Sequence, residues 1–465
     1  MQKRKVSLTG NGYMELSKIH RVYFVGIGGI GMSAIARFFH EKGVAVSGYD
    51  KTSTQLTQQL EAEGIRIHYT EDLDQIDRSA DLVVYTPAIP AAHTELVYYR
   101  ENGYEVVKRS DVLQEITREL FAITVAGTHG KTTVSTMIAH LLRHTGYGCN
   151  AFLGGISSNY GKNFWSSDKQ VAVIEADEYD RSFLKLSPDI AILTAMDPDH
   201  LDIYGTEAEV ETAFIQYTQN IKPNGTLLAK HGLPRGPELK GDNKLTYSLQ
   251  NNAADIYAAN IRMEDGGYEF DVVQQDWMID KVKLRIGGMH NVENAVSAIG
   301  VAHLLGIGSD KIRAAVADFK GIRRRFEYLV KKENAVYIDD YAHHPEELRA
   351  LITSAKTLFR EKKCTVVFQP HLFTRTRDFA EGFGEALSLA DEVILLPIYP
   401  AREQPIAGVT SEMIAARIEG PVVKIIARDE VPAYLREHPA ELLITAGAGD
   451  IDLLREPLQT LLNKP

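Results

Sequence analysis

Residues 127–133, Gly-Thr-His-Gly-Lys-Thr-Thr, are of the types that bind the phosphates of a nucleotide. They follow an apolar run at 121–125, which is typical of a buried strand, and precede residues 134–142, whose apolar side chains recur at helical spacing. A strand, a glycine turn and a helix start together aim backbone N–H groups and the helix dipole at one anion. Lys131 would add a positive charge at the β- and γ-phosphates, and the Thr132 hydroxyl could bind Mg²⁺.

This loop is shorter than the common G-x-x-x-x-G-K-[ST] motif, because Val125 stands at the position of its first glycine. A strand–turn–helix without a ligand would explain the glycines but would leave the Lys-Thr-Thr sequence unexplained. We therefore predict nucleotide binding by all seven residues of the loop, which are Gly127, Thr128, His129, Gly130, Lys131, Thr132 and Thr133.

A second glycine-rich loop follows the apolar run at 22–25 and matches G-x-G-x-x-G, with Gly26, Gly28, Gly29 and Gly31. Asp50, about 20 residues further on, ends the next expected strand at 44–49 and completes a dinucleotide-binding fingerprint. The loop alone would suggest an NAD-dependent dehydrogenase, or a tight turn without a ligand. A UDP group would fit equally well, because the glycines admit any diphosphate and the acid can accept from ribose hydroxyls. Two phosphate-binding loops imply two phosphorylated ligands, which favours a ligase or a kinase.

Acidic clusters follow two further apolar strands. Glu175 begins the sequence Glu-Ala-Asp-Glu, and at that end of an α/β sheet it would lie beside the phosphate loop, where it could bind Mg²⁺. An acidic loop facing solvent is the alternative. In the second cluster His200 could be a metal ligand, with Asp199 and Asp202 fixing its tautomer. A lone histidine is usually structural, but two such clusters at neighbouring strand ends favour a functional site.

Basic and amide residues recur in the second half of the chain. Asn291 opens an expected helix at 291–305, where it could be only the helix N-cap. The three arginines at 323–325 suit a phosphoryl group in transfer, or else an interdomain salt-bridge cluster.

Two segments after expected strands combine histidines with other polar residues. One, at 339–345, contains His343 and His344; the other, at 368–377, contains His371 and two arginines. A histidine and two arginines form a clamp for a small carboxylate, although the arginines could instead pair with acids of the chain itself.

Length and composition limit the classes of protein. A chain of 465 residues is long enough for about three domains, and apolar strands alternate with helical patterns throughout, which predicts parallel α/β sheets. The net charge of −11 argues against a broad nucleic-acid surface. Two distant cysteines fit a reducing cytoplasm, and neither a signal peptide nor a membrane-spanning segment is expected.

Taken in order, these motifs resemble the Mur ligases, the ATP-dependent amide-forming enzymes of peptidoglycan precursor synthesis. The resemblance covers about residues 19–453, and its specific motifs are Gly-Ile-Gly-Gly-Ile-Gly-Met, Gly-Thr-His-Gly-Lys-Thr-Thr, Glu-Ala-Asp-Glu and Phe-Gln-Pro-His with Thr-Arg-Thr. It implies three domains: a Rossmann-like UDP-sugar-binding domain at 1–118, a central P-loop-type ATPase domain with a mainly parallel sheet at 119–321, and a C-terminal Rossmann-like amino-acid-binding domain at 322–465.

The resemblance also implies roles for individual residues. The first glycine loop and Asp50 would bind the UDP-sugar, and the second loop the phosphates of ATP. Mg²⁺ would be bound by Thr132, Glu175 and His200. Further ATP contacts would come from Asn291, Asn294, Arg325 and Asp340. The incoming amino acid would be bound by His343, His371 and Arg375. Catalytic roles would fall to Lys131, His200, Arg325 and His344.

The chain departs from the family pattern at two places. Many Mur ligases have a carbamylated lysine soon after the Asp-His motif, whereas residues 209–217 contain no lysine. Its absence is common in the alanine-adding branch and removes one residue from the metal site. Leu372 stands where some relatives have an arginine, so Arg375 is the preferred carboxylate ligand, ahead of Arg377.

The implied reaction joins L-alanine to the lactyl carboxylate of UDP-N-acetylmuramate through an acyl phosphate, with ATP and Mg²⁺ as cofactors. We expect a cytoplasmic monomer or weak homodimer that binds neither nucleic acid nor membrane. Three alternatives stay open: a recycling ligase that attaches a preformed tripeptide to the same UDP-sugar, an NAD-dependent oxidoreductase, and a noncatalytic nucleotide-binding regulator. The oxidoreductase would leave Lys131, Thr132, Glu175 and His200 without a role, and the regulator would release no phosphate.

Overall fold

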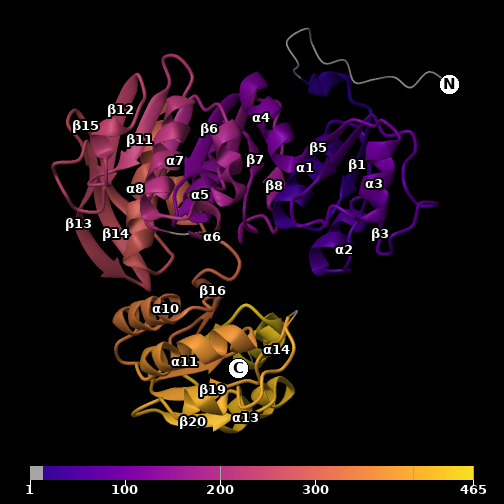
Figure 1. The fold of residues 1–465 in the computed structure, drawn as a ribbon. Coiled ribbons are helices and arrows are strands. Elements are labelled where there is room, and N and C mark those ends of the chain that lie inside the picture. Colours follow the sequence, from indigo (N-terminus) through magenta and orange to yellow (C-terminus); the bar gives the residue numbers. More distant parts are fainter. Residues whose placement is uncertain (1–13, 199–200, 402, 464–465) are drawn as a thin grey trace. The chain divides into compact units, whose positions relative to one another are not determined.

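Three β-sheets, each accompanied by helices, make up the computed structural model, which describes residues 14–198, 201–401 and 403–463 (Figure 1). The expected α/β class with mainly parallel sheets is confirmed. The chain forms two compact units. One runs up to Ala259 and includes Asp271–Asp280 and Glu293–Val316, and the other comprises Asn260–Phe270, Lys281–Val292 and Ala317–Pro465.

The first sheet has five parallel strands in the order β3-β2-β1-β4-β5. The strands are β1 (Arg21–Val25), β2 (Ala45–Tyr49), β3 (Arg66–His68), β4 (Leu82–Tyr85) and β5 (Val106–Lys108). The helices are α1 (Ile30–Glu41), α2 (Gln55–Ala62), α3 (Thr94–Glu101) and α4 (Arg109–Glu119). Alternate side chains of β1 face opposite sides, since Phe24 packs in the core with α1 whereas Tyr23 packs with Tyr99 of α3. Both faces are therefore buried, as in other parallel sheets.

The second sheet has ten strands in the order β15-β14-β13-β12-β11-β10-β6-β9-β7-β8. Its first strands in the chain are β6 (Phe121–Ala126), β7 (Asn150–Phe152), β8 (Phe164–Trp165), β9 (Val171–Glu175) and β10 (Ile190–Leu193). The later ones are β11 (Thr226–Lys230), β12 (Asn243–Ser248), β13 (Ile256–Glu264), β14 (Gly267–Gln274) and β15 (Trp277–Leu284). The accompanying helices are α5 (Lys131–His144), α6 (Leu201–Tyr204), α7 (Glu207–Gln219), α8 (Met289–Leu304) and α9 (Ser309–Asp318). Strand β6 pairs in parallel with β10 on one side and β9 on the other, so the carboxyl ends of these three strands lie together.

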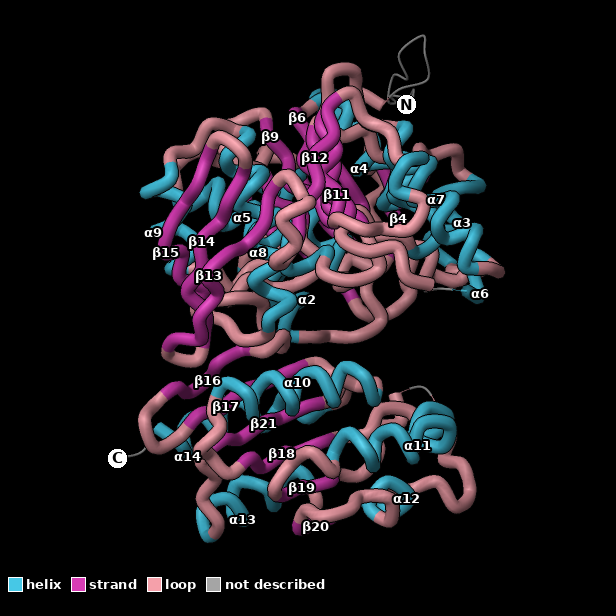
Figure 2. The backbone as a smooth tube through the Cα atoms, turned by 90° about the vertical axis from the view of Figure 1, so that its left-hand side faces the viewer, coloured by secondary structure: helices cyan, strands magenta, loops and turns pink. Residues whose placement is uncertain are grey.

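The third sheet has the order β16-β17-β21-β18-β19-β20, and only the pair β16–β17 is antiparallel. Its strands are β16 (Glu327–Lys331), β17 (Val336–Asp340), β18 (Cys364–Phe368), β19 (Glu392–Leu395), β20 (Val422–Ile425) and β21 (Leu442–Ala446). Its helices are α10 (Pro345–Leu358), α11 (Phe373–Leu387), α12 (Glu412–Ala415), α13 (Val431–Glu437) and α14 (Arg455–Asn463). Figure 2 shows α10 and α11 over one face and α13 and α14 over the other. Accordingly, Val366 packs with the first pair and Val367 with the second.

The strands expected at 22–25, 44–49 and 121–125 are each present within one or two residues of those bounds. The short strands β3, β5, β7, β8 and β20 were not predicted, because segments of two to four residues carry little periodicity. The domain boundaries remain a prediction. No helix in the described ranges is both long and apolar enough to cross a membrane.

Candidate active site

The phosphate loop joins β6 to α5, and its backbone has the shape that the glycines predict. Gly127 has φ +134° and Gly130 has φ +82°, and Gly130 forms the N-cap of α5. A Cβ on Gly127 would lie 2.2 Å from Thr194 Oγ1, so no larger residue fits between the loop and the end of β10. The N-terminus of α5, with its unpaired N–H groups, is thereby presented at the carboxyl end of the sheet, where an anion can bind.

Lys131 is the first residue of α5, and its ammonium is held at the loop by protein groups. Nζ donates to Gly127 O at 2.7 Å and to Glu178 Oε1 at 2.7 Å. The Glu178 side chain is only 1% exposed, and burial raises the pKa of its carboxyl while the Lys131 charge opposes that rise. Glu178 belongs to the Glu-Ala-Asp-Glu motif, but its pairing with Lys131 was not predicted, because that contact spans 47 residues. The lysine is thus positioned beside the loop and charge-paired.

Glu175 ends β9 beside the phosphate loop, as predicted. Its Oε1 accepts from the Thr132 hydroxyl at 3.0 Å, and its Oε2 accepts from the Gly154 N–H at 2.9 Å. The two predicted Mg²⁺ ligands therefore touch, and both offer oxygen atoms, which Mg²⁺ prefers. The third, His200, lies outside the described residues. Within the described ranges no group of three or more His, Cys, Asp or Glu side chains is arranged as a metal site.

The remaining loop residues contact the end of β10 and the helix α8. Thr128 Oγ1 accepts from the Asp197 N–H at 3.1 Å, and the His129 side chain is 73% exposed with Nε2 3.9 Å from Asp197 Oδ2. Thr133 is buried in the first turn of α5. Asn294 Oδ1 would lie 3.0 Å from a Cβ on Gly130, so this predicted ATP contact borders the loop.

Asn291 makes a different contact from the one that the N-cap alternative required. Helix α8 begins at Met289, and the Asn291 amide donates to Gly287 O at 2.6 Å from inside the first turn. The N-cap interpretation is therefore wrong, whereas the ATP contact stays a prediction.

The first glycine loop joins β1 to α1, at the point where the strand order 3-2-1-4-5 reverses and ligands bind in folds of this kind. Gly26 turns at the end of β1, and Gly29 immediately precedes α1. The Gly28 N–H donates to Asp50 Oδ2 at 2.7 Å, and Asp50 Oδ1 accepts from Thr52 N at 3.2 Å. Asp50 therefore holds the shape of the loop, and a contact with a ribose would be additional to that.

A cavity of about 190 Å³ lies between this loop and Glu175. Its lining includes Gly31, Arg109 and Glu175. Arg109 packs so tightly on the loop that a Cβ on Gly31 would lie 2.3 Å from its Nη1, and its Nη2 lies 3.7 Å from Asp177 Oδ2. Sequence reasoning missed Arg109 because it follows β5, whose three residues gave no strand signal. Recognition of that strand would have placed a cation at the same sheet edge as the glycine loop.

The arginines at 323–325 do not act as one cluster. Arg324 pairs with the fully buried Asp339 at 3.2 Å and donates to Gly447 O, so it is a structural residue. Arg325 is exposed, and no ion pair or side-chain hydrogen bond connects it to a described residue. The ion pair of Arg324 lies within residues 322–465, so it is not the interdomain cluster of the alternative. Arg325 keeps an exposed cation, and its charge acts on the nearby Asp340 carboxylate.

Asp340 ends β17 and is tied to the backbone. Its two oxygens accept from the N–H groups of Phe326 at 2.6 Å and Ala342 at 2.7 Å. Burial raises the pKa of Asp340 to about 6, and these two donors oppose the rise. A contact with ATP would have to use the remaining lone pairs of this carboxylate.

Strand β17 ends near the loop that follows β18, and this brings the predicted amino-acid-binding histidines together. The rings of His343 and His371 are 6.4 Å apart, and His371 stacks on Tyr399. Arg375 lies in the first turn of α11. His344 precedes α10 and contacts Phe379 at 4.7 Å, which supports a structural role. Burial lowers the pKa of both His343 and His371, and the nearby Arg375 charge lowers both further.

This depressed pKa predicts a pH effect on stability. His371 has a lower pKa in the folded protein than in the unfolded chain, so the folded protein binds a proton there less readily. Lowering the pH through the pKa of the unfolded chain therefore adds protons to the unfolded state and destabilises the fold. We expect His371→Gln to reduce the loss of thermal stability between pH 7 and pH 5, measured as the unfolding midpoint against pH. Parallel curves for variant and parent would contradict this.

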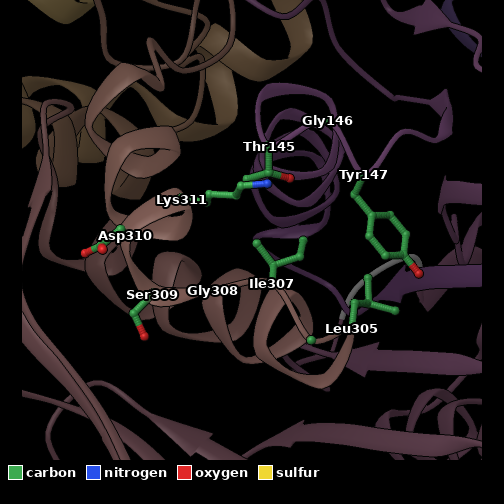
Figure 3. Close-up of a pocket in the computed structure, with 10 residues that line it drawn as sticks. Thr145, Gly146, Tyr147, Leu305, Ile307, Gly308, Ser309, Asp310 and Lys311 are labelled. Atoms are coloured by element: carbon green, nitrogen blue, oxygen red, sulfur yellow. The ribbon is translucent and has the colours of Figure 1, made fainter.

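A second hollow, of about 510 Å³, lies at the other end of α5 (Figure 3). Thr145 and Tyr147 line it together with Ile307 from the turn between α8 and α9 and Lys311 from the first turn of α9. Helix α5 has 14 residues, which separates this hollow from the phosphate loop by about 20 Å. It contains none of the predicted site residues.

Sequence profiles of one protein family match three consecutive parts of the chain. Residues 21–120 match the sequence profile described as Mur ligase family, catalytic domain. Residues 125–302 match the Mur ligase middle domain, and residues 324–449 match the Mur ligase glutamate ligase domain. The chain belongs to the Mur ligase family. The resemblance inferred from the motifs is thereby confirmed.

Individual Mur ligases resemble the chain over nearly its full length. A UDP-N-acetylmuramate–L-alanine ligase of Phocaeicola vulgatus is 48% identical, covering 97% of this chain and 100% of its own length. One of Porphyromonas gingivalis is also 48% identical, over 95% and 99%. Among solved structures, the UDP-N-acetylmuramate–alanine ligase of Thermotoga maritima has a TM-score of 0.79 at 30% identity, covering 94% of this chain and 97% of that one.

Proposed function

We propose that the protein joins L-alanine to the lactyl carboxylate of UDP-N-acetylmuramate in an ATP-dependent reaction, giving UDP-N-acetylmuramoyl-L-alanine, ADP and phosphate. The observation that carries this proposal is the cavity whose walls hold the first glycine loop, Arg109 and Glu175, with Thr132 of the phosphate loop bonded to Glu175. A UDP-sugar and ATP bound at their respective loops would meet there. The 48% identical relatives named for this reaction support the choice of substrates.

The lactyl carboxylate is a poor acyl donor, because direct attack by an amine would have to expel oxide. A carboxylate oxygen attacks the γ-phosphorus of ATP, the bond to the β–γ bridging oxygen breaks, and ADP leaves. The amine of L-alanine then attacks the acyl carbon, and the tetrahedral intermediate expels phosphate and loses a proton. Lys131 would neutralise charge on the transferring phosphoryl group, and the family pattern proposes Arg325 for the same role.

Mg²⁺ fits the oxygen atoms that Thr132 and Glu175 present beside the loop. Bound there, it would neutralise negative charge on the phosphates of ATP. His200 is proposed as a further ligand from the family pattern. We expect the enzyme to act in the cytoplasm, and its two cysteines are free buried thiols, as that compartment allows.

Phosphate release tests the proposed function. The assay contains ATP, Mg²⁺ and UDP-N-acetylmuramate, and compares L-alanine, the tripeptide L-Ala-γ-D-Glu-meso-diaminopimelate, and no amine acceptor. We expect release that depends on L-alanine, with a matching mass gain on the UDP-sugar. Release only with the tripeptide would assign the protein to the recycling branch. No phosphate release with any acceptor would contradict the ligase function.

Arg109 provides a prediction for UDP-sugar binding. We expect Arg109→Ala to raise the KM for UDP-N-acetylmuramate about 10- to 100-fold, the effect of losing one charge-assisted contact with an anionic substrate group. The KM for ATP should change little. Gly31→Ala is the matched variant, because the added methyl group would occupy the position of the Arg109 guanidinium. Its effect should be similar and should not add to that of Arg109→Ala. Fully additive effects of the two substitutions on this KM, or an unchanged KM in Arg109→Ala, would contradict a role of Arg109 in UDP-sugar binding.

A further inference from the structure

Helix α1 lies beside the hairpin that contains β7 and β8 (Figure 1). Arg37 of α1 and Asn163 of the hairpin form a buried polar bridge between them. The side chain of Asn163 is fully buried, and that of Arg37 is 1% exposed. Arg37 Nη1 donates to Asn163 Oδ1 at 2.5 Å, and Arg37 Nε donates to Glu63 Oε2 at 2.7 Å. A buried guanidinium needs such partners, because an unpaired charge in the interior is costly.

The amide of Asn163 uses its other polar atom on the start of α1. Nδ2 donates to Ile30 O at 2.5 Å and to Ser33 Oγ at 3.0 Å. Ile30 lies within the first glycine loop and begins α1. Aromatic packing of Phe38 against Phe164, with ring centroids 6.2 Å apart, accompanies these bonds. Asn163 is thus fixed to the loop that is proposed to bind the UDP-sugar.

On its other side Asn163 is connected to Glu175, the carboxylate that is proposed to bind Mg²⁺. The Asn163 carbonyl accepts from Leu153 N at 3.0 Å, and the next residue, Gly154, donates its N–H to Glu175 Oε2 at 2.9 Å. Glu175 Oε1 in turn contacts Thr132. A continuous series of bonds therefore runs from the first glycine loop, through Asn163, to the phosphate loop.

The same residues form both walls of the cavity. Ile30 and Gly31 line one side, and Leu153, Gly154 and Glu175 line the other. Asn163 bonds to a residue of each wall, so its two sets of hydrogen bonds fix the spacing across the cavity.

We infer that Asn163, held by Arg37, is a positioning residue that sets the distance between the UDP-sugar loop and the Glu175–Thr132 pair. It thereby aligns the lactyl carboxylate with the γ-phosphate. The inference rests on the proposed function. Neither Asn163 nor Arg37 belongs to a sequence motif, and the contact between them spans 126 residues.

The test compares Asn163→Asp with Asn150→Asp. Asn163→Asp keeps the size and the acceptor for Arg37 but replaces both donors with a carboxylate oxygen against Ile30 O. We expect kcat to fall and the KM for UDP-N-acetylmuramate to rise, together lowering kcat/KM about 10- to 100-fold, since small displacements of reacting groups have effects of this size. The Kd of ATP, measured without the UDP-sugar, should stay within about twofold.

Asn150 supplies the matched control, because it is 3% exposed in β7 and its amide donates to Lys169 O and Val171 O rather than to α1. Asn150→Asp should lower the unfolding midpoint comparably while leaving kcat/KM within about twofold. Equal losses of activity in the two variants, or normal kinetics in Asn163→Asp, would overturn the inference.

Arg37→Lys is the second variant, for use if Asn163→Asp does not fold. Lysine keeps a charge near Glu63 but lacks the planar fork that bonds two partners at once. Arg37→Lys should raise the KM for the UDP-sugar, as Asn163→Asp does, and an unchanged KM would overturn the inference. An unmodified protein that does not ligate L-alanine would instead remove the proposed function, which separates the two failures.

Discussion

Replacing Lys131 with methionine is expected to lower kcat for ligation by about 1,000-fold, while UDP-N-acetylmuramate binds with nearly unchanged affinity. The size follows from the loss of a positive charge on the transferring phosphoryl group, where one positioned donor has effects of this order. Binding of the UDP-sugar should persist because its proposed loop follows a different strand, β1. Single-turnover ligation and equilibrium binding of the UDP-sugar measure the two quantities.

The variant Lys131→Met also leaves Glu178 buried without its counter-ion, so a loss of folding must be separated from a loss of catalysis. The double variant Lys131→Met/Glu178→Gln removes that buried charge, because glutamine has the shape of glutamate without its negative charge. We expect it to recover the unfolding midpoint but not the activity. Recovery of ligation in the double variant, or loss of UDP-sugar binding in both, would contradict the separate roles of the two loops.

The second large effect is expected for Glu175→Gln. The amide would still face Thr132 and Gly154, but it would lack the negative charge that favours Mg²⁺. We expect the Mg²⁺ concentration for half-maximal activity to rise about 10- to 100-fold, with a lower kcat at saturation. Titration of phosphate release with Mg²⁺ measures both quantities.

Asp177→Asn is the control within the same acidic sequence, because Asp177 faces Arg109 rather than Thr132. Its Mg²⁺ requirement should match that of the unmodified protein. An equal rise of the Mg²⁺ requirement in the two variants would argue against a specific role for Glu175.

The sequence predicts the phosphate loop well because every residue of that loop lies within one strand–turn–helix segment. Local spacing then determines which groups meet, as Gly130 and Lys131 illustrate. Glu175 could be placed for a related reason, since carboxyl ends of neighbouring parallel strands lie at one sheet edge. The two long, apolar strands β6 and β9 made that argument possible.

Contacts between distant segments could not be predicted in the same way. Glu178 and Asn163 depend on partners 47 and 126 residues away, and neither belongs to a periodic pattern. Arg109 was missed because the short strand β5 gives no signal. The arginine triplet shows the same limit, because only tertiary structure separates the buried ion pair of Arg324 from the exposed cation of Arg325.

We expect ATP to activate the lactyl carboxylate for attack by L-alanine, and transfer of an oxygen isotope reveals that activation. UDP-N-acetylmuramate labelled with ¹⁸O in both carboxylate oxygens is incubated with the protein, ATP, Mg²⁺ and L-alanine, and the products are weighed by mass spectrometry. Transfer of a carboxylate oxygen to phosphorus predicts one ¹⁸O in the released phosphate and one in UDP-N-acetylmuramoyl-L-alanine. Unlabelled phosphate, or phosphate released without the alanyl product, would show that the reaction does not pass through an acyl phosphate that L-alanine attacks.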